Sequence, residues 1–173
     1  MRAAVLSRRI AAGLGLGALL LGAQARAQTA SVEERLAALE AREEIRELIL
    51  AYGRALDTRD FVAFSGLFAE EDGTWVGGFG TATGRTAIFG MMDDRIGHAA
   101  EPVEPTSHHV FGNIRIEVEG DTAEATTKWI FVVPAAAGGP QWLYLGHYED
   151  RFVRRNGRWF FLRREAFTDL PPQ

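Results

Sequence analysis

Five side chains in this sequence could transfer protons: Tyr52, Asp57 and three histidines, His108, His109 and His147. Tyr52 lies on an apolar stripe with helical spacing. Asp57 follows at the end of that stripe, where the helix macrodipole disfavours negative charge. An aspartate there needs a compensating cation, a turn role or a functional role. Imidazole, carboxylate and phenol around an apolar cavity are typical of proton transfer, with histidine or aspartate as base and the tyrosine hydroxyl polarising a carbonyl.

The two adjacent histidines cannot both face the same side of a strand, because neighbouring side chains alternate. Strict alternation places His108 on the side of Ile114, which favours His108 for the interior. A β-bulge at Gly112 would reverse this parity and favour His109 instead. Alternation alone therefore leaves the choice between the two histidines open.

Each candidate also has an ordinary structural explanation. Tyr52 fits a core aromatic residue, His147 an exposed ring, and the tryptophans core positions. Arg163 and Glu165 share a face of the final strand and are expected to pair there. Besides the doublet, the residues expected to bind substrate are large or cationic side chains of the later elements: Phe68, Trp75, Trp129, His147 and Arg163.

Composition and missing motifs exclude several kinds of chemistry. We expect no metal site, since the adjacent histidines point opposite ways and no His, Cys or Asp cluster has ligand spacing. We expect no cofactor, because the sequence holds no phosphate loop, dinucleotide fingerprint, G-x-S-x-G elbow or cysteine nucleophile. A net charge of -4 and the lack of a basic stripe disfavour nucleic-acid binding.

The first 27 residues are typical of a cleavable signal peptide. Three arginines, at positions 2, 8 and 9, precede an apolar run over 10–23 and two small-x-small cleavage sites. The run is too short for a stable membrane span, which needs about 20 residues. The sequence therefore predicts export to the periplasm or medium and a mature domain over 28–173. The pair Arg8-Arg9 is compatible with twin-arginine export.

Hydrophobic periodicity predicts an α+β domain with helices first and an antiparallel sheet after them. The expected helices cover 32–56, as one helix or two joined near Arg42, a segment after Asp60, and 86–96. The expected strands cover 107–119, 122–134, 141–155 and 158–167, with a short strand pair over 74–83. The loop over 97–105 is expected to be a mobile cover of a pocket.

Several stretches together resemble the SnoaL-like family of the nuclear-transport-factor-2-like superfamily. They are 32–40, 45–52, Leu56-Asp57-Thr58-Arg59-Asp60-Phe61, Gly84-Arg85, Ser107-His108-His109, 120–123, Gly146-His147-Tyr148-Glu149-Asp150 and Asn156-Gly157-Arg158-Trp159. The resemblance implies a cone-shaped α+β barrel, with N-terminal helices packed against a curved antiparallel sheet. It also implies a homodimer or homotrimer, because the open sheet face of this scaffold commonly pairs with a copy of itself.

Dehydratases of this family carry a helical tyrosine and aspartate and a strand histidine. By resemblance these fall on Tyr52, Asp57 and His109, which favours His109 of the doublet and implies the bulge. The next strand of those enzymes carries a second catalytic histidine or aspartate. This chain has Thr126-Thr127 and the apolar run 130–133 at those places.

Two hypotheses of function follow. The first is a cofactor-independent lyase or isomerase, similar to dehydratases and cyclases, acting on a small cyclic or polyketide-like molecule in an apolar pocket. In it His109, oriented by Asp57, removes a proton next to a carbonyl, and Tyr52 stabilises the oxyanion or protonates a leaving hydroxyl. The alternative is a non-catalytic exported domain that binds a small molecule or serves as an accessory, which the missing second catalytic group favours.

Overall fold

The computed structural model describes residues 31–101 and 103–171. The expected signal peptide over residues 1–27 lies outside the described residues. Residues from Val32 onward form one compact unit. In the described part of the chain, no helix is long and apolar enough to cross a membrane.

Three helices form where the hydrophobic spacing predicts them: α1 (Val32–Asp57), α2 (Phe61–Gly66) and α3 (Arg85–Ile96). The segment α1 is one continuous helix rather than two. Its apolar stripe buries Ile45 and Ile49 completely. The Asp60 carboxylate caps α2 by accepting the Ala63 N–H at 2.9 Å. This cap fixes the sharp turn between α1 and α2.

Six strands form one sheet in the order β2-β1-β6-β5-β4-β3. Their bounds are β1 (Thr74–Gly77), β2 (Gly80–Thr83), β3 (His108–Glu119), β4 (Thr122–Pro134), β5 (Pro140–Arg155) and β6 (Arg158–Leu170). The expected antiparallel sheet of the long strands β3 to β6 is confirmed. The short strand β1 joins it by pairing with β6 in parallel, which the sequence did not predict. The sheet is therefore mixed, and it stays open, with β2 and β3 at its two edges.

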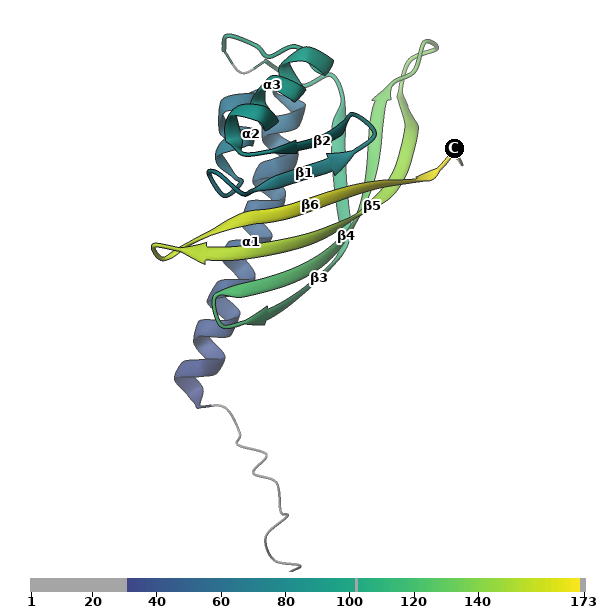
Figure 1. Ribbon diagram of the computed structural model, residues 1–173. Helices are drawn as coiled ribbons and strands as arrows, with labels where there is room; N and C mark the ends of the chain where they lie inside the picture. Colours follow the sequence, from purple (N-terminus) through teal and green to yellow (C-terminus); the bar gives the residue numbers. More distant parts are fainter. Residues whose placement is uncertain (1–30, 102, 172–173) are drawn as a thin grey trace, which may run out of the picture. The chain divides into compact units, whose positions relative to one another are not determined.

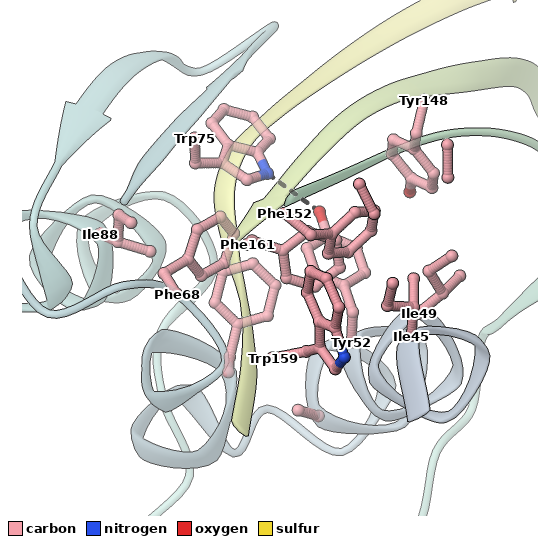
Figure 2. Close-up of a cluster of buried hydrophobic side chains, with 14 of the residues drawn as sticks. Ile45, Ile49, Tyr52, Phe68, Trp75, Ile88, Tyr148, Phe152, Trp159 and Phe161 are labelled. Carbon is pink, nitrogen blue, oxygen red and sulfur yellow. Dashed lines mark hydrogen bonds between the residues drawn. The ribbon is translucent and has the colours of Figure 1, made fainter. Parts of the chain in front are cut away.

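The long strands curve around α1, which lies on their inner face (Figure 1). Alternate residues of β4, β5 and β6 point inward and pack with the apolar stripe of α1 and with α2. Aromatic side chains dominate this core, and Figure 2 shows many of them meeting around Tyr52. No helix of the described residues covers the outer face of the sheet.

A β-bulge interrupts β3, as the resemblance implied. The register with β4 shifts between Gly112 and Arg115, and Asn113 has a positive φ of 51°. Below the bulge Ile114 faces inward, and above it His109 faces inward while His108 is exposed. The extra residue therefore changes the parity of the inward-facing residues. Odd-numbered residues face inward before the bulge, and even-numbered residues face inward after it.

Candidate active site

The end of α1 and the start of β3 bring Asp57 and His109 together. One carboxylate oxygen of Asp57, Oδ2, accepts the backbone N–H of His109 at 2.9 Å, and the other, Oδ1, lies 2.6 Å from the ring Nδ1. The exposed fractions of the two side chains are only 11% for Asp57 and 13% for His109. The compensating partner that the helix terminus requires is thus a histidine, while the neighbouring Arg54 pairs with Glu47.

This geometry defines the proton positions on the His109 ring. An ionised carboxylate can only accept hydrogen bonds, so with Asp57 ionised Nδ1 carries a proton, and this N–H donates a hydrogen bond to Asp57. In the neutral ring, Nε2 is then the basic nitrogen. No hydrogen-bond partner of Nε2 is present among the described residues. A histidine held in this way is oriented to accept a proton at Nε2.

Aromatic rings surround the imidazole of His109. Its centroid lies 4.7 Å from Phe131, 6.3 Å from Trp129 and 6.4 Å from Phe111. Phe111 in turn fills the space above Gly53 of α1, where a Cβ would lie 2.7 Å from the ring. The imidazole therefore sits in a mostly aromatic setting and keeps only a small exposed fraction.

Tyr52 does not join the dyad. It is fully buried, and its hydroxyl accepts the Trp75 Nε1–H at 2.9 Å, as Figure 2 shows. Its ring lies 4.7 Å from Phe64 and 5.6 Å from Tyr148, all core residues. Burial raises the pKa of Tyr52 above its usual value, with the nearby guanidinium of Arg164 opposing. Of the expected catalytic trio, the structure brings two members into contact.

A buried ion pair lies deeper in the interior. Arg164 donates through Nε and Nη2 to the two carboxylate oxygens of Asp150, both at 2.7 Å, and both side chains are completely buried. The guanidinium carbon lies 4.0 to 4.2 Å from the ring centroids of Tyr52, Tyr148 and Phe161. Burial raises the pKa of Asp150 even with Arg164 beside it. For Arg164, burial is the largest influence and lowers the pKa, but the charge and hydrogen bonds of Asp150, together with Tyr52 and Tyr148, outweigh it, so the net shift is upward.

The sequence analysis missed this pair. Asp150 has the same parity as Tyr148 and Phe152, so alternation along β5 gave a usable signal of a carboxylate on the core face. Alternation along β6 could not predict that Arg164 faces the core, because the β5–β6 register shifts between Arg151 and Phe152. The shift places Phe161 and Arg164 on the same face although their numbers differ in parity.

Other expected substrate-binding residues lie apart from the dyad. Phe68 and Trp75 belong to the core. His147 and Arg163 are on the outer face of the sheet: His147 pairs with Asp169 at 2.7 Å, and Arg163 pairs with Glu165 at 2.8 Å. Only Trp129 contacts the ring of His109 among these candidates.

Two hollows in the described structure also lie away from Asp57 and His109. The first, of about 350 Å³, is on the charged outer face and is lined by residues of β3 to β6, Arg163 and Glu165 among them. The second, of about 460 Å³, is at the β3–β4 turn. Core side chains such as Trp129 and Tyr148 occupy the inner face below the dyad, where the sequence predicted an apolar pocket.

The loop that the sequence predicted as a cover lies beside the dyad segment. The N–H groups of Ala99 and Val103 donate to the carbonyls of Arg59 and Thr58, directly after Asp57, at 3.3 and 3.1 Å. The loop is thus attached to the end of α1; whether it moves stays a prediction. Across the described ranges, no group of three or more His, Cys, Asp or Glu side chains could hold a metal ion.

A curved open sheet wrapped around an N-terminal helix, with an aspartate at the helix end facing a strand histidine, defines the class as nuclear-transport-factor-2-like. The chain belongs to the SnoaL-like family, whose domain model matches residues 37–165. An NTF2-like protein with a cystatin-like fold from Novosphingobium aromaticivorans is 31% identical, with a TM-score of 0.68 covering 83% of this chain and 94% of that one.

Two further solved structures of similar fold are named as enzymes. A putative scytalone dehydratase from Novosphingobium aromaticivorans is 25% identical, with a TM-score of 0.62 covering 76% of this chain and 86% of that one. The hexachlorocyclohexane dehydrochlorinase LinA-type3 from Novosphingobium barchaimii is 18% identical, with a TM-score of 0.63 covering 78% and 90%. At that identity the second likeness concerns the fold alone.

Proposed function

We propose that this protein is a cofactor-independent lyase or isomerase in which His109 is the general base. The observation that carries the proposal is the two-point attachment of His109 to Asp57, through the ring Nδ1 and the backbone N–H. It fixes both the tautomer and the direction of the ring. The substrate is a small cyclic or polyketide-like molecule with a C–H that Nε2 can reach.

The setting of the dyad supports base catalysis rather than a structural ion pair. An exposed pair would contribute little to stability, but this pair is about nine-tenths buried and keeps one ring nitrogen without a partner. Asp57 stabilises the imidazolium that forms when Nε2 takes a proton. The similarity to a structure named as a putative scytalone dehydratase supports the same class of reaction.

Proton abstraction can be tested before the natural substrate is known. A panel of cyclic ketones in heavy water reports base catalysis as exchange of the hydrogens next to the carbonyl, measured by NMR. We expect exchange to fall at least about a hundredfold in His109→Gln. The matched control is His108→Gln, because that neighbour is exposed and its loss leaves the dyad intact.

The outcomes separate the two candidate functions. Equal exchange by wild type and His109→Gln would remove His109 as the base. Tight binding of panel members without exchange by wild type would favour the alternative, a non-catalytic binding or accessory domain. The observation that favours this alternative is that, within the described part of the chain, Asp57 is the only titratable group paired with His109.

We also propose that the protein works after export, as a homodimer or homotrimer, with no part in nucleic-acid binding. The N-terminal sequence supports export, and the uncovered outer sheet face supports assembly. Mass spectrometry of periplasmic protein should find a mature chain that starts at residue 28. Light scattering of that chain should give two or three times the monomer mass, and a monomer would contradict the assembly.

A further inference from the structure

A band of charged side chains crosses the outer face of the sheet, over the four long strands. It lines the first hollow, of about 350 Å³. The strand register divides the band into two neighbouring rows, each running in the order β3, β4, β5, β6. One row consists of Arg115, Thr126, Glu149 and Glu165. The other row consists of Glu117, Glu124, Arg151 and Arg163.

The second row places like charges directly opposite each other on neighbouring strands. Glu117 pairs with Glu124, which we call the acidic pair, and Arg151 pairs with Arg163, the basic pair. Like charges in such positions destabilise a sheet. The ion pair between Arg151 and Glu124 offsets this little, because it is 3.7 Å long and its side chains are 67% and 75% exposed. The isolated chain therefore gains nothing from this order of charges.

The order of charges is complementary to itself. A two-fold axis parallel to the strands, between β4 and β5, brings a second copy face to face with the first and exchanges β3 with β6 and β4 with β5. The acidic pair of each copy then meets the basic pair of the other. In the neighbouring row, Arg115 meets Glu165. Glu149 meets Thr126, whose hydroxyl can donate a hydrogen bond.

An apolar row on the same face selects this axis. Val110, Ile130 and Leu145 lie side by side on the outer face, and Val110 is 51% exposed. The axis along the strands places this row against the same row of the second copy. An axis across the strands, through the middle of the band, would also match the charges, but it would place Ile130 against the polar Gly120-Asp121 turn. Burial of apolar surface drives most association, so the axis along the strands is favoured.

We propose that two copies of this chain pair outer face to outer face about this axis, with the acidic pair of each copy against the basic pair of the other. Sheets packed in this aligned way keep their strands within about 30° of each other. A partner carrying charges of one sign would be repelled by half of the band, whereas a second copy matches both halves.

This inference rests on the assembly proposed above and not on the role of His109. It selects the dimer over the trimer and names the side chains that specify it. A three-fold axis joins different patches of neighbouring copies, so it cannot match this face to itself.

The test reverses charges at two positions that cannot meet within one chain. Glu117 on β3 and Arg163 on β6 lie three strand spacings apart, roughly 14 Å. In the proposed dimer, Glu117→Arg alone and Arg163→Glu alone each create two contacts between like charges. We expect each variant to raise the dissociation constant of the dimer at least about a hundredfold, measured by sedimentation of the mature chain.

A mixture of the two single variants tests the cross-copy contact directly. In a mixed pair, one copy has arginine at both positions and the other has glutamate at both, so both contacts join opposite charges. We expect a 1:1 heterodimer whose dissociation constant lies within about tenfold of the wild-type value. The double variant Glu117→Arg with Arg163→Glu should likewise dimerise with itself.

Two control variants reverse the same charges away from the sheet. Glu40→Arg and Arg35→Glu change exposed residues of α1 and should dimerise as the wild type does. Circular dichroism with thermal unfolding shows that each variant is folded.

Three results would overturn the inference: a trimeric wild type, single variants that dimerise as tightly as wild type, or folded single variants that stay monomeric when mixed. A monomeric wild type would overturn the proposed assembly as well, whereas a trimer would overturn only this inference. His109→Gln should dimerise normally, so the dimer and the catalytic base are tested independently.

Discussion

Removing Arg164 should destabilise the domain more than any surface change. Arg164→Met leaves the carboxylate of Asp150 in the core without its two 2.7 Å hydrogen bonds and without solvent. Breaking a buried pair in this way costs about 3–5 kcal/mol. Domains of this size have a total stability of about 5–15 kcal/mol. The single variant should therefore lose a large part of its free energy of unfolding.

The double variant makes this prediction sharp. Asp150→Leu with Arg164→Met removes both charges together. Neither variant residue leaves a buried charge without its partner, so the cost of desolvating a lone charge does not arise. We expect its stability to lie near wild type or about 1–4 kcal/mol above it. Loss of the guanidinium contacts with three aromatic rings works against the gain. Urea unfolding followed by circular dichroism measures all four proteins of the cycle.

The pH dependence gives a second measurement. Burial already raises the pKa of Asp150 in the presence of Arg164, and removal of the cation should raise it further. A carboxyl whose folded pKa lies above its unfolded value favours folding below that unfolded value. This contribution is lost as pH rises through the folded value. Arg164→Met should thus be least destabilised near pH 4 and most destabilised at pH 7.

The reasoning would fail if either single variant cost less than about 1 kcal/mol at pH 7, since a pair exposed to water behaves in that way. It would also fail if the double variant lost the sum of the two single losses. Additive losses mean that the two side chains do not act as a unit.

Two further predictions concern sites outside the ion pair. Gly53→Ala should destabilise the protein, because overpacking the 2.7 Å contact with a ring of β3 costs about 1–3 kcal/mol, against a gain of about 1 kcal/mol in helix propensity. Gly66→Ala places no heavy atom within 4 Å of the new Cβ and should be neutral or stabilising. If urea unfolding showed that both variants lower the free energy of unfolding, or that both raise it, the packing argument would be contradicted. The hydrogen bond from Arg155 lowers the pKa of Asp72 below its usual 3.8. The stability advantage of wild type over Asp72→Asn should therefore be complete at neutral pH and vanish as pH falls through the lowered pKa. An advantage of equal size at neutral pH and at a pH far below the usual 3.8 would contradict that assignment.

The elements of the fold were predictable because the apolar residues follow clear periods. The stripe through Ile45 and Ile49 specified α1, and the Gly120-Asp121 and Asn156-Gly157 turns specified the two tight hairpins. The parallel pairing of β1 with β6 was not predictable, since strands of four residues carry no signal of their partner.

The candidate site was predictable only in part. Alternation pointed to His108, and the resemblance was needed to favour His109. Burial separates the phenol of Tyr52 from the dyad, and no local pattern distinguishes a helical tyrosine that faces a core from one that faces a ligand. Arg164 was missed because its importance comes from a partner on another strand, Asp150.

The bulge in β3 makes the chemistry of this domain depend on strand register as well as on residue type. If the same residues formed a regular strand while the lower half of β3 kept its pairing with β4, strict alternation would turn His108 and Val110 inward, and His109 would face solvent. Deletion of Asn113 instead removes the extra residue, so it should leave His109 opposite Phe131 and facing inward. A single inserted residue far from the dyad thus selects which of two adjacent rings is the reactive one.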